Sequence, residues 1–223
     1  MFNAEKYIQA LLSVMKDDFG ERLMYVGLQG SYLRGEANEN SDIDVMLVLD
    51  CLTVGDMKTY QGVLGRIGSF EKSCGFICGR DELLRWNPLE VCQLLHTTKD
   101  LFGTLSDYLP DASRADEINY VKLSLGNLYH ELCHRYIHAD GEQNRMRFRK
   151  TCKGIFFLLQ NLVYLETGTF AVTKKELRTL VSEEDGIMLS MTDLPDDFDF
   201  DRMFRFTFAW LQNLFIRIDG IEP

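Results

Sequence analysis

Two aspartates begin the most strand-like segment of the chain, and this pair constrains the fold more than any other feature. Asp42-Ile43-Asp44 is followed directly by the apolar run Val45–Leu49. Such a run, rich in β-branched residues, is typical of a strand inside a sheet, and we expect this strand over Ile43–Leu49. Side chains alternate faces along a strand, so Asp42 and Asp44 are expected on one side and Ile43 in the core. Two neighbouring carboxylates repel each other unless a cation lies between them.

A Gly-Ser pair precedes the aspartates by about ten residues. Gly30-Ser31 ends a short apolar segment, Met24–Leu28, which predicts a neighbouring strand. Glycine lets the backbone approach a ligand, and a turn that opens a helix presents free N–H groups to phosphate. Mg²⁺ prefers one or two carboxylates together with phosphate oxygens and water. The pattern therefore predicts a site for a metal-bound triphosphate and phosphoryl transfer. The alternative is a hairpin turn and a strand-end aspartate that have no catalytic role.

The combination of Gly30-Ser31 with Asp42 and Asp44 resembles the signature of the DNA polymerase beta-like nucleotidyltransferase superfamily. The helical pattern that follows makes the whole chain resemble the antibiotic nucleotidyltransferases of the kanamycin and streptomycin type. It is also similar, more weakly, to the minimal nucleotidyltransferases of toxin–antitoxin pairs. The resemblance implies that Gly30 and Ser31 hold the triphosphate and that Asp42 and Asp44 ligate Mg²⁺. The implied reaction moves a nucleoside monophosphate onto a hydroxyl and releases pyrophosphate. We expect AMP from ATP, with another nucleoside triphosphate as the alternative donor.

A third carboxylate is where the sequence departs from this resemblance. Many members carry an acid on the following strand, as a metal ligand or as the general base. The expected strand Cys74–Cys78 contains none, and Glu71 just before it is our candidate. The alternative for Glu71 is a plain surface glutamate.

Four further residues complete the expected nucleotide-binding set. Arg34 and Ser41 lie between the Gly-Ser pair and the second strand, and Arg149 and Lys153 belong to a basic cluster in the second half. In the antibiotic enzymes that this chain resembles, a lysine of the helical domain neutralises phosphate, which implies that role for Lys153 or Arg149. A solvated basic helix face is the alternative.

The hydrophobic pattern predicts an α+β domain, a small mixed sheet with flanking helices, followed by an all-α helical bundle. Around Gly103–Ser113 the composition shifts, so we expect a nucleotidyltransferase domain over 1–105 and a helical domain over 113–223. The active site is expected in the cleft between them. Helices are predicted from the apolar spacing at 4–18, 55–67, 114–138, 145–167, 173–182 and 201–217.

The charge balance of the chain limits the kinds of partner that we expect it to bind. The chain has 34 acidic and 24 basic residues and a net charge of −10, which disfavours nucleic acid. An acidic cleft favours a cationic small-molecule acceptor such as an aminoglycoside. The alternative is an antitoxin-like regulatory protein, or one that adenylylates proteins, with weak or no small-molecule activity. The sequence does not decide between a monomer and a homodimer.

Several other patterns bear on location and metal binding. The longest apolar uncharged stretch, Gly154–Leu165, is shorter than the roughly 20 residues of a membrane helix. No signal peptide is visible, and the six cysteines form no CxxC pair, so we expect a cytoplasmic protein with reduced thiols. His130, His134 and His138 recur every four residues, which favours core or interface histidines, with a zinc site as the alternative.

Overall fold

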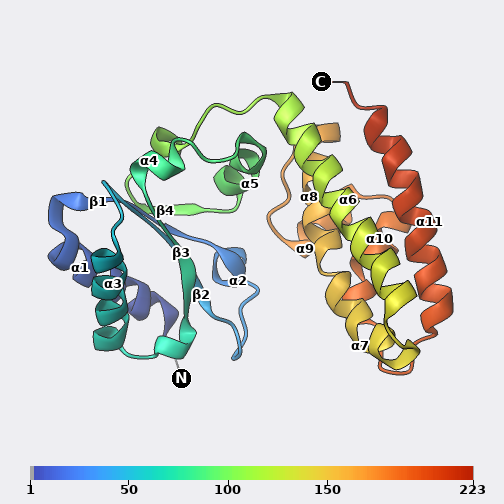
Figure 1. Ribbon diagram of the computed structural model, residues 1–223, viewed down its shortest axis with the longest axis horizontal. Helices are drawn as coiled ribbons and strands as arrows, with labels where there is room; N and C mark the ends of the chain where they lie inside the picture. The colour runs from blue at the N-terminus through green and yellow to red at the C-terminus, as the bar shows by residue number, and fades with distance from the viewer. Residues whose placement is uncertain (1–2, 223) are drawn as a thin grey trace. The chain divides into compact units, whose positions relative to one another are not determined.

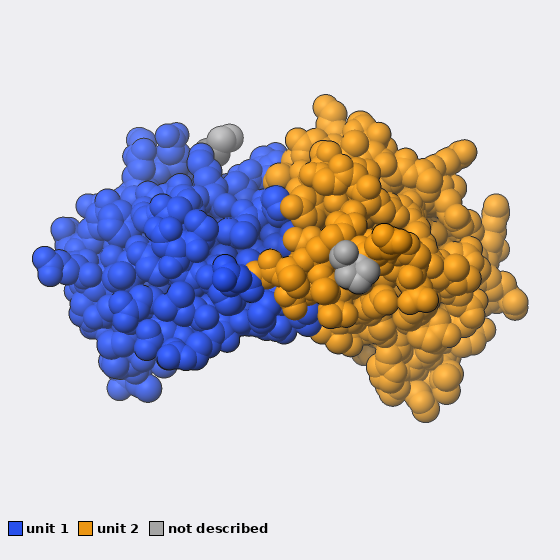
Figure 2. Space-filling view, turned by 90° about the horizontal axis from the view of Figure 1, so that it is seen from above, with its two compact units in different colours: residues 1–111 blue, residues 112–223 orange. Residues whose placement is uncertain are grey.

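The computed structural model describes residues 3–222, and the chain forms two compact units. Unit 1 is Met1–Asp111 and unit 2 is Ala112–Pro223, which Figure 2 draws in blue and orange. Unit 1 combines a mixed sheet with flanking helices, and unit 2 is helical, as predicted. Among the described residues, none of the helices has both the length and the apolar character needed to cross a bilayer.

A four-stranded sheet forms the centre of unit 1 (Figure 1). Its order is β3-β2-β1-β4, with β2 parallel to β3 and β1 antiparallel to both β2 and β4. The strands are β1 (Leu23–Leu28), β2 (Ile43–Leu49), β3 (Ser73–Gly79) and β4 (Lys99–Phe102). The predicted second strand therefore has the bounds that the structure gives β2. The fourth strand was not predicted, because it has only four residues and two of them are exposed.

The two faces of β2 meet different surroundings because its side chains alternate. Ile43, Val45 and Leu47 pack in one hydrophobic cluster with residues of α1 (Ala4–Phe19) and α3 (Val54–Ile67). Met46 and Val48 belong to a second cluster on the other face. Asp42 and Asp44 share the parity of this second set, so they lie on the face that α1 and α3 do not cover. The remaining helices of unit 1 are α2 (Gly30–Arg34), α4 (Arg80–Leu83) and α5 (Val91–His96).

Unit 2 is built around one hydrophobic cluster to which several helices contribute. Its helices are α6 (Arg114–His138), α7 (Gly141–Thr151), α8 (Gly154–Thr167), α9 (Lys174–Leu180), α10 (Glu183–Leu189) and α11 (Phe200–Asp219). The long helix α6 contacts α7, α8 and α11. It begins at a capping box, in which the Ser113 hydroxyl accepts from the Asp116 N–H and the Asp116 carboxylate accepts from the Ser113 N–H.

The prediction of one helix over 145–167 is wrong. The structure contains two helices there, because α7 ends at Thr151 and α8 begins at Gly154. Glycine disfavours helix continuation, and the Thr151 hydroxyl is occupied in hydrogen bonds to Arg135 and to the carbonyl of Arg147. Arg149 and Lys153 therefore do not share the face of a continuous helix.

Candidate active site

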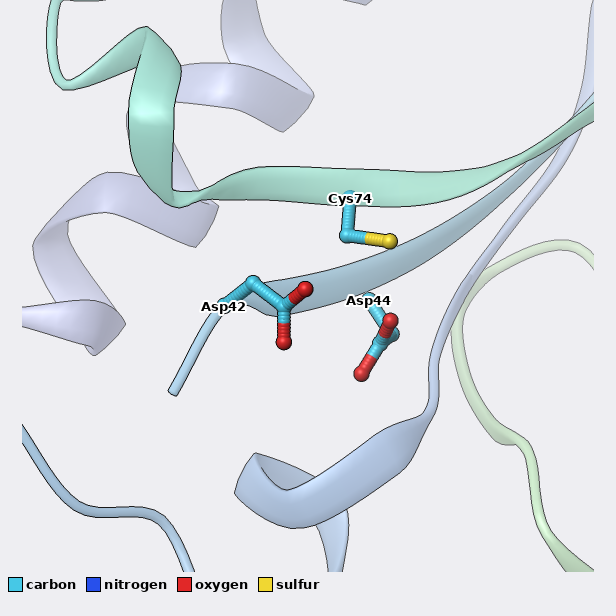
Figure 3. Close-up of side chains that lie close together, drawn as sticks. All are labelled: Asp42, Asp44 and Cys74. Atoms are coloured by element: carbon cyan, nitrogen blue, oxygen red, sulfur yellow. The ribbon is translucent and has the colours of Figure 1, made fainter. Parts of the chain in front are cut away.

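The two aspartates lie side by side on one face of the sheet, as the strand pattern predicts. Asp42 directly precedes β2 and is exposed, whereas Asp44 is its second residue and is half-buried. Figure 3 shows both carboxylates on the same side of the strand. The single residue between them, Ile43, is 1% exposed and packs into the core. The geometry therefore gathers two negative charges where one cation could contact both.

The Gly-Ser turn is in direct contact with this pair. Gly30 adopts a φ of +69°, a left-handed conformation that favours glycine. A Cβ atom at Gly30 would lie 1.8 Å from Oδ2 of Asp44, so no side chain fits there while Asp44 keeps its position. The N–H of Gln29 donates to the carbonyl of Asp44 at 2.8 Å. A backbone hydrogen bond and a close contact thus join the turn to the strand, and Ser31 follows Gly30 in the first turn of α2.

Cys74 lies beside Asp44 on β3, the strand on which a third acid was expected. The parallel register pairs it with Asp44, and its thiol hydrogen-bonds with the Asp44 carboxylate. One ligand atom each from Asp42, Asp44 and Cys74 lie within 4.8 Å of one another (Figure 3). Burial, the bond to Asp44 and the two carboxylate charges raise the pKa of the Cys74 thiol to about 11. The sulfur therefore carries its proton at neutral pH in the absence of a cation.

Burial is also the main cause that raises the pKa of Asp44 above its usual value, and the charge of Asp42 adds to it. The hydrogen bond from Cys74 and the charge of Arg34 act in the opposite direction. Arg34 itself is ion-paired with Glu36 at 2.9 Å. Within residues 3–222, no lysine, arginine or histidine forms an ion pair with either aspartate. Two oxygen donors without a cationic partner fit a divalent metal, and the adjacent thiol adds a softer donor.

Ser41 and Glu71, which were predicted as site residues, have other positions in unit 1. The Ser41 hydroxyl accepts from the N–H of Asn38 at 2.9 Å in the turn before β2. Glu71 is exposed in the 3₁₀ turn Phe70–Lys72 and is not part of the three-residue cluster. Its catalytic role stays a prediction. Lys72, which the sequence analysis did not select, donates from Nζ to the carbonyls of Glu39 and Ser41, the latter at 3.3 Å.

The predicted phosphate ligands of unit 2 have their own contacts within that unit. Arg149 donates to the carbonyl of Leu194 at 2.8 Å and to Asp196 at 2.5 Å. Lys153 is exposed between α7 and α8. A nucleotide-binding role for Arg149 and Lys153 therefore stays a prediction.

The three histidines of α6 are not core residues. His130, His134 and His138 are all exposed, and that part of the expectation is wrong. Their rings follow one another along the helix, with centroids 5.8 Å and 4.6 Å apart. An interface role stays a prediction.

Comparison with known proteins agrees with the site geometry. Residues 8–85 match the family model of the nucleotidyltransferase domain. The matched segment is about a third of the chain and includes the Gly-Ser turn, both aspartates and Cys74. No curated protein sequence matches the chain.

Solved structures extend the comparison to both units. The spectinomycin adenyltransferase AAD(9) from Enterococcus faecialis, solved with ATP and spectinomycin, matches with a TM-score of 0.60 and 15% identity. The match covers 98% of this chain and 100% of that chain, and at this identity it shows a shared fold. A toxin–antitoxin structure with AMP-PNP matches at 22% identity over 58% of this chain and 92% of that chain. Its TM-score of 0.33 is too low to support an argument.

Proposed function

We propose that the chain is a Mg²⁺-dependent nucleotidyltransferase that transfers AMP from ATP to a hydroxyl of a small molecule. The observation that carries the proposal is the contact between the Gly30 turn and Asp44, with Asp42 on the same face of the strand. This contact brings a turn whose glycine leaves the backbone uncovered against two carboxylates that, within the described residues 3–222, form no ion pair with a lysine, arginine or histidine. The match to the nucleotidyltransferase domain covers the same residues.

In the proposed reaction the acceptor oxygen attacks the α-phosphorus of ATP. The bond from that phosphorus to the oxygen bridging to the β-phosphate breaks, and pyrophosphate leaves with the bonding electrons. Asp42 and Asp44 would hold Mg²⁺, which neutralises charge on the phosphates. Ser31 and Arg34 would contact the triphosphate from α2. The hydroxyl proton would pass to Glu71, directly or through water.

The net charge of the chain and the solved adenyltransferase with the same fold support one class of acceptor. The net charge of −10 favours a cationic acceptor over a polyanion. The adenyltransferase with the same fold was solved with ATP and spectinomycin. We therefore propose an amine-bearing, hydroxylated small molecule of the aminoglycoside type.

Pyrophosphate release provides the test. The full chain is incubated with Mg²⁺, each common nucleoside triphosphate and a panel of hydroxylated amines. Asp44→Asn is expected to lower the rate by at least about 100-fold, since the loss of one transition-state contact already costs this much. Asp50→Asn, near the opposite end of β2, is the matched control and should retain activity. The proposal fails if the wild-type chain releases no pyrophosphate with any acceptor, or if Asp44→Asn is as active as the wild type.

The proposed base is tested separately. Glu71→Gln is expected to lower the rate by about 100-fold. An unchanged rate would remove Glu71 from the mechanism and leave proton transfer to solvent.

The thiol at the third position favours a second candidate function. Cys74 lies in the cluster where the resemblance implies a third acid, as expected for a domain that binds nucleotide but turns it over poorly. In that case the chain would be a regulatory partner or would adenylylate another protein. Co-purification of a partner with unreacted nucleotide would support regulation. Mass spectrometry of proteins incubated with isotope-labelled ATP would detect adenylylation.

A further inference from the structure

We propose that Asp42, Asp44 and Cys74 together form a mixed oxygen and sulfur site that binds Zn²⁺ in preference to Mg²⁺. The inference rests on the proposed function only in that both use the same two carboxylates. It concerns which cation this chain retains, and what that cation does to the Mg²⁺-supported reaction.

The three donors are close enough for one ion. Their ligand atoms lie within 4.8 Å of one another. Zinc bonds of about 2.3 Å to sulfur and about 2.1 Å to oxygen put the ligands of a tetrahedral site about 3.5 Å apart. Small side-chain rotations close this difference. Asp42 and Cys74 are exposed and Asp44 is half-buried, so a cation reaches the cluster from solvent.

The backbone fixes the thiol beside the carboxylates. Cys74 pairs with Asp44 in the parallel ladder of β2 and β3, so both side chains emerge from the same face of the sheet. At the next residue, a Cβ atom on Gly75 would lie 2.1 Å from the carbonyl of Val45. A glycine at this position thus permits the close approach of the two strands. The thiol is consequently held at the cluster by the sheet and not by a flexible loop.

Donor chemistry decides the preference. Mg²⁺ is a hard cation that takes oxygen ligands and keeps several waters, so it gains little from sulfur. A thiolate is a soft ligand that favours Zn²⁺ and similar ions. Two carboxylates and one thiolate give Zn²⁺ three protein ligands and leave one position for water or a phosphate oxygen. The binding of such an ion displaces the thiol proton, as in other zinc–cysteine sites.

The other cysteines lack this environment. Cys51 is exposed beside the guanidinium of Arg22, at 3.7 Å. Cys78 and Cys152 are buried in the cores of units 1 and 2. Over residues 3–222, the only group of three potential ligands at this spacing is the one that contains Cys74. Cys51 therefore provides a control thiol that is exposed but whose acidic neighbours, Asp50 and Asp56, are both ion-paired with Arg22.

Zinc in this site should inhibit the reaction supported by Mg²⁺. A four-coordinate ion with three protein ligands has one free position, whereas octahedral Mg²⁺ on two carboxylates leaves several for phosphate oxygens and water. The sensitivity of the transferase to free Zn²⁺ would then depend on one residue, Cys74.

Cadmium binding is the direct test, because a Cd²⁺–thiolate bond gives a charge-transfer band in the ultraviolet. The reduced full chain is titrated with Cd²⁺, and Zn²⁺ affinity is measured by competition with a chromophoric zinc indicator. The wild type and Cys51→Ser are expected to show the band and the same Zn²⁺ affinity. Cys74→Ser should lose the band and at least about tenfold in Zn²⁺ affinity, since even the loss of a supporting contact costs that much. Circular dichroism confirms that each variant is folded.

Two further measurements separate this inference from the proposed function. Cys74→Asp should bind Mg²⁺ more tightly and Zn²⁺ more weakly than the wild type. In the pyrophosphate assay, Cys74→Ser should need at least about tenfold more Zn²⁺ for half-inhibition. If the Cd²⁺ band or the Zn²⁺ affinity is unchanged in Cys74→Ser, the inference is overturned, even when the wild type releases pyrophosphate. If the band depends on Cys74 but no acceptor yields pyrophosphate, the inference holds and the proposed function fails.

Discussion

Two aspartates, one in each unit, differ in the partners and charges that surround their carboxylates. Asp185 of unit 2 is 2% exposed and accepts hydrogen bonds from Trp210 Nε1 and Arg217 Nη1, each at 2.8 Å. Asp44 of unit 1 is half-buried next to Asp42, and its partner is the thiol of Cys74. One carboxylate is fully compensated by the protein, and the other is placed against a second negative charge.

The contrast separates structural from functional acids. A buried charge that keeps its partners contributes to a defined core, and the loss of a partner is costly. A pair of acids without cations is unfavourable for the folded chain alone, so a cation from solution must supply the compensation. Mutations at the two places should therefore change stability in opposite directions.

The largest effect is expected for Asp185→Asn. It leaves Arg217 without one of its two carboxylate partners and should lower the free energy of unfolding of unit 2 by about 3 kcal/mol. Urea denaturation followed by circular dichroism measures this change. Asp197→Asn, an exposed aspartate in the same unit, is the control and should change stability by less than about 0.5 kcal/mol. Equal effects of the two variants would contradict the contrast.

Gly30→Ala should have the next largest effect. The methyl group would push the Asp44 carboxylate away and force alanine into a positive φ, at a cost of about 2 kcal/mol in unfolding free energy. Gly35→Ala isolates the backbone part, since Gly35 has a φ of +68° with nothing within 4 Å of its Cβ position. That control should cost about 1 kcal/mol. Only Gly30→Ala should also weaken Mg²⁺–nucleotide binding, and a loss of binding in both variants would contradict the proposed contact.

A smaller effect of opposite sign is expected for the double variant Asp42→Asn with Asp44→Asn. The removal of two like charges should raise the free energy of unfolding of unit 1 by up to about 1 kcal/mol in the absence of divalent ions. Thermal melts with a chelator and with added Mg²⁺ measure this gain. The metal should stabilise the wild type and not the variant. A destabilised variant would mean that the two acids serve the fold.

The smallest effect concerns Asp193, an exposed acid that Lys174 contacts at 2.8 Å. The hydrogen bond from Lys174 is the main cause that lowers the pKa of Asp193. A lowered folded-state pKa stabilises the chain above the unfolded value, about 3.9, and this stabilisation disappears as the pH falls through the folded pKa. Asp193→Asn should therefore cost at most about 0.5 kcal/mol at neutral pH and nothing in strong acid. Lys174→Gln should reduce the same pH dependence, as measured by urea melts across that range, while Thr192 and Arg178 keep the remainder.

The sequence pattern was sufficient to predict those parts of the fold that depend on residues close together in the chain. The predicted bounds 114–138 are those of α6, and 43–49 are those of β2. The shared face of Asp42 and Asp44 follows from strand alternation alone. The nucleotidyltransferase fold followed from two residue pairs and their spacing, and the family model matches the segment that contains them.

Features that depend on pairing between strands were not accessible from the sequence. Cys74 joins the cluster because β3 lies parallel to β2 in one register, and spacing along the chain does not give that register. The sequence pattern favours Glu71, three residues earlier, although the neighbour of Asp44 is a thiol. The predicted helix over 145–167 failed for a local reason, since a single glycine at 154 was outweighed by the apolar pattern around it.

The capping box at the start of α6 has a practical consequence for dissecting the chain. Both partners of the box, Ser113 and Asp116, lie after the boundary between Asp111 and Ala112. A truncated chain begun at Ala112 would keep every group that closes the first turn of α6. If unit 2 is expressed by itself, the N-terminal backbone N–H groups of α6 would therefore keep their hydrogen-bond partners in the capping box.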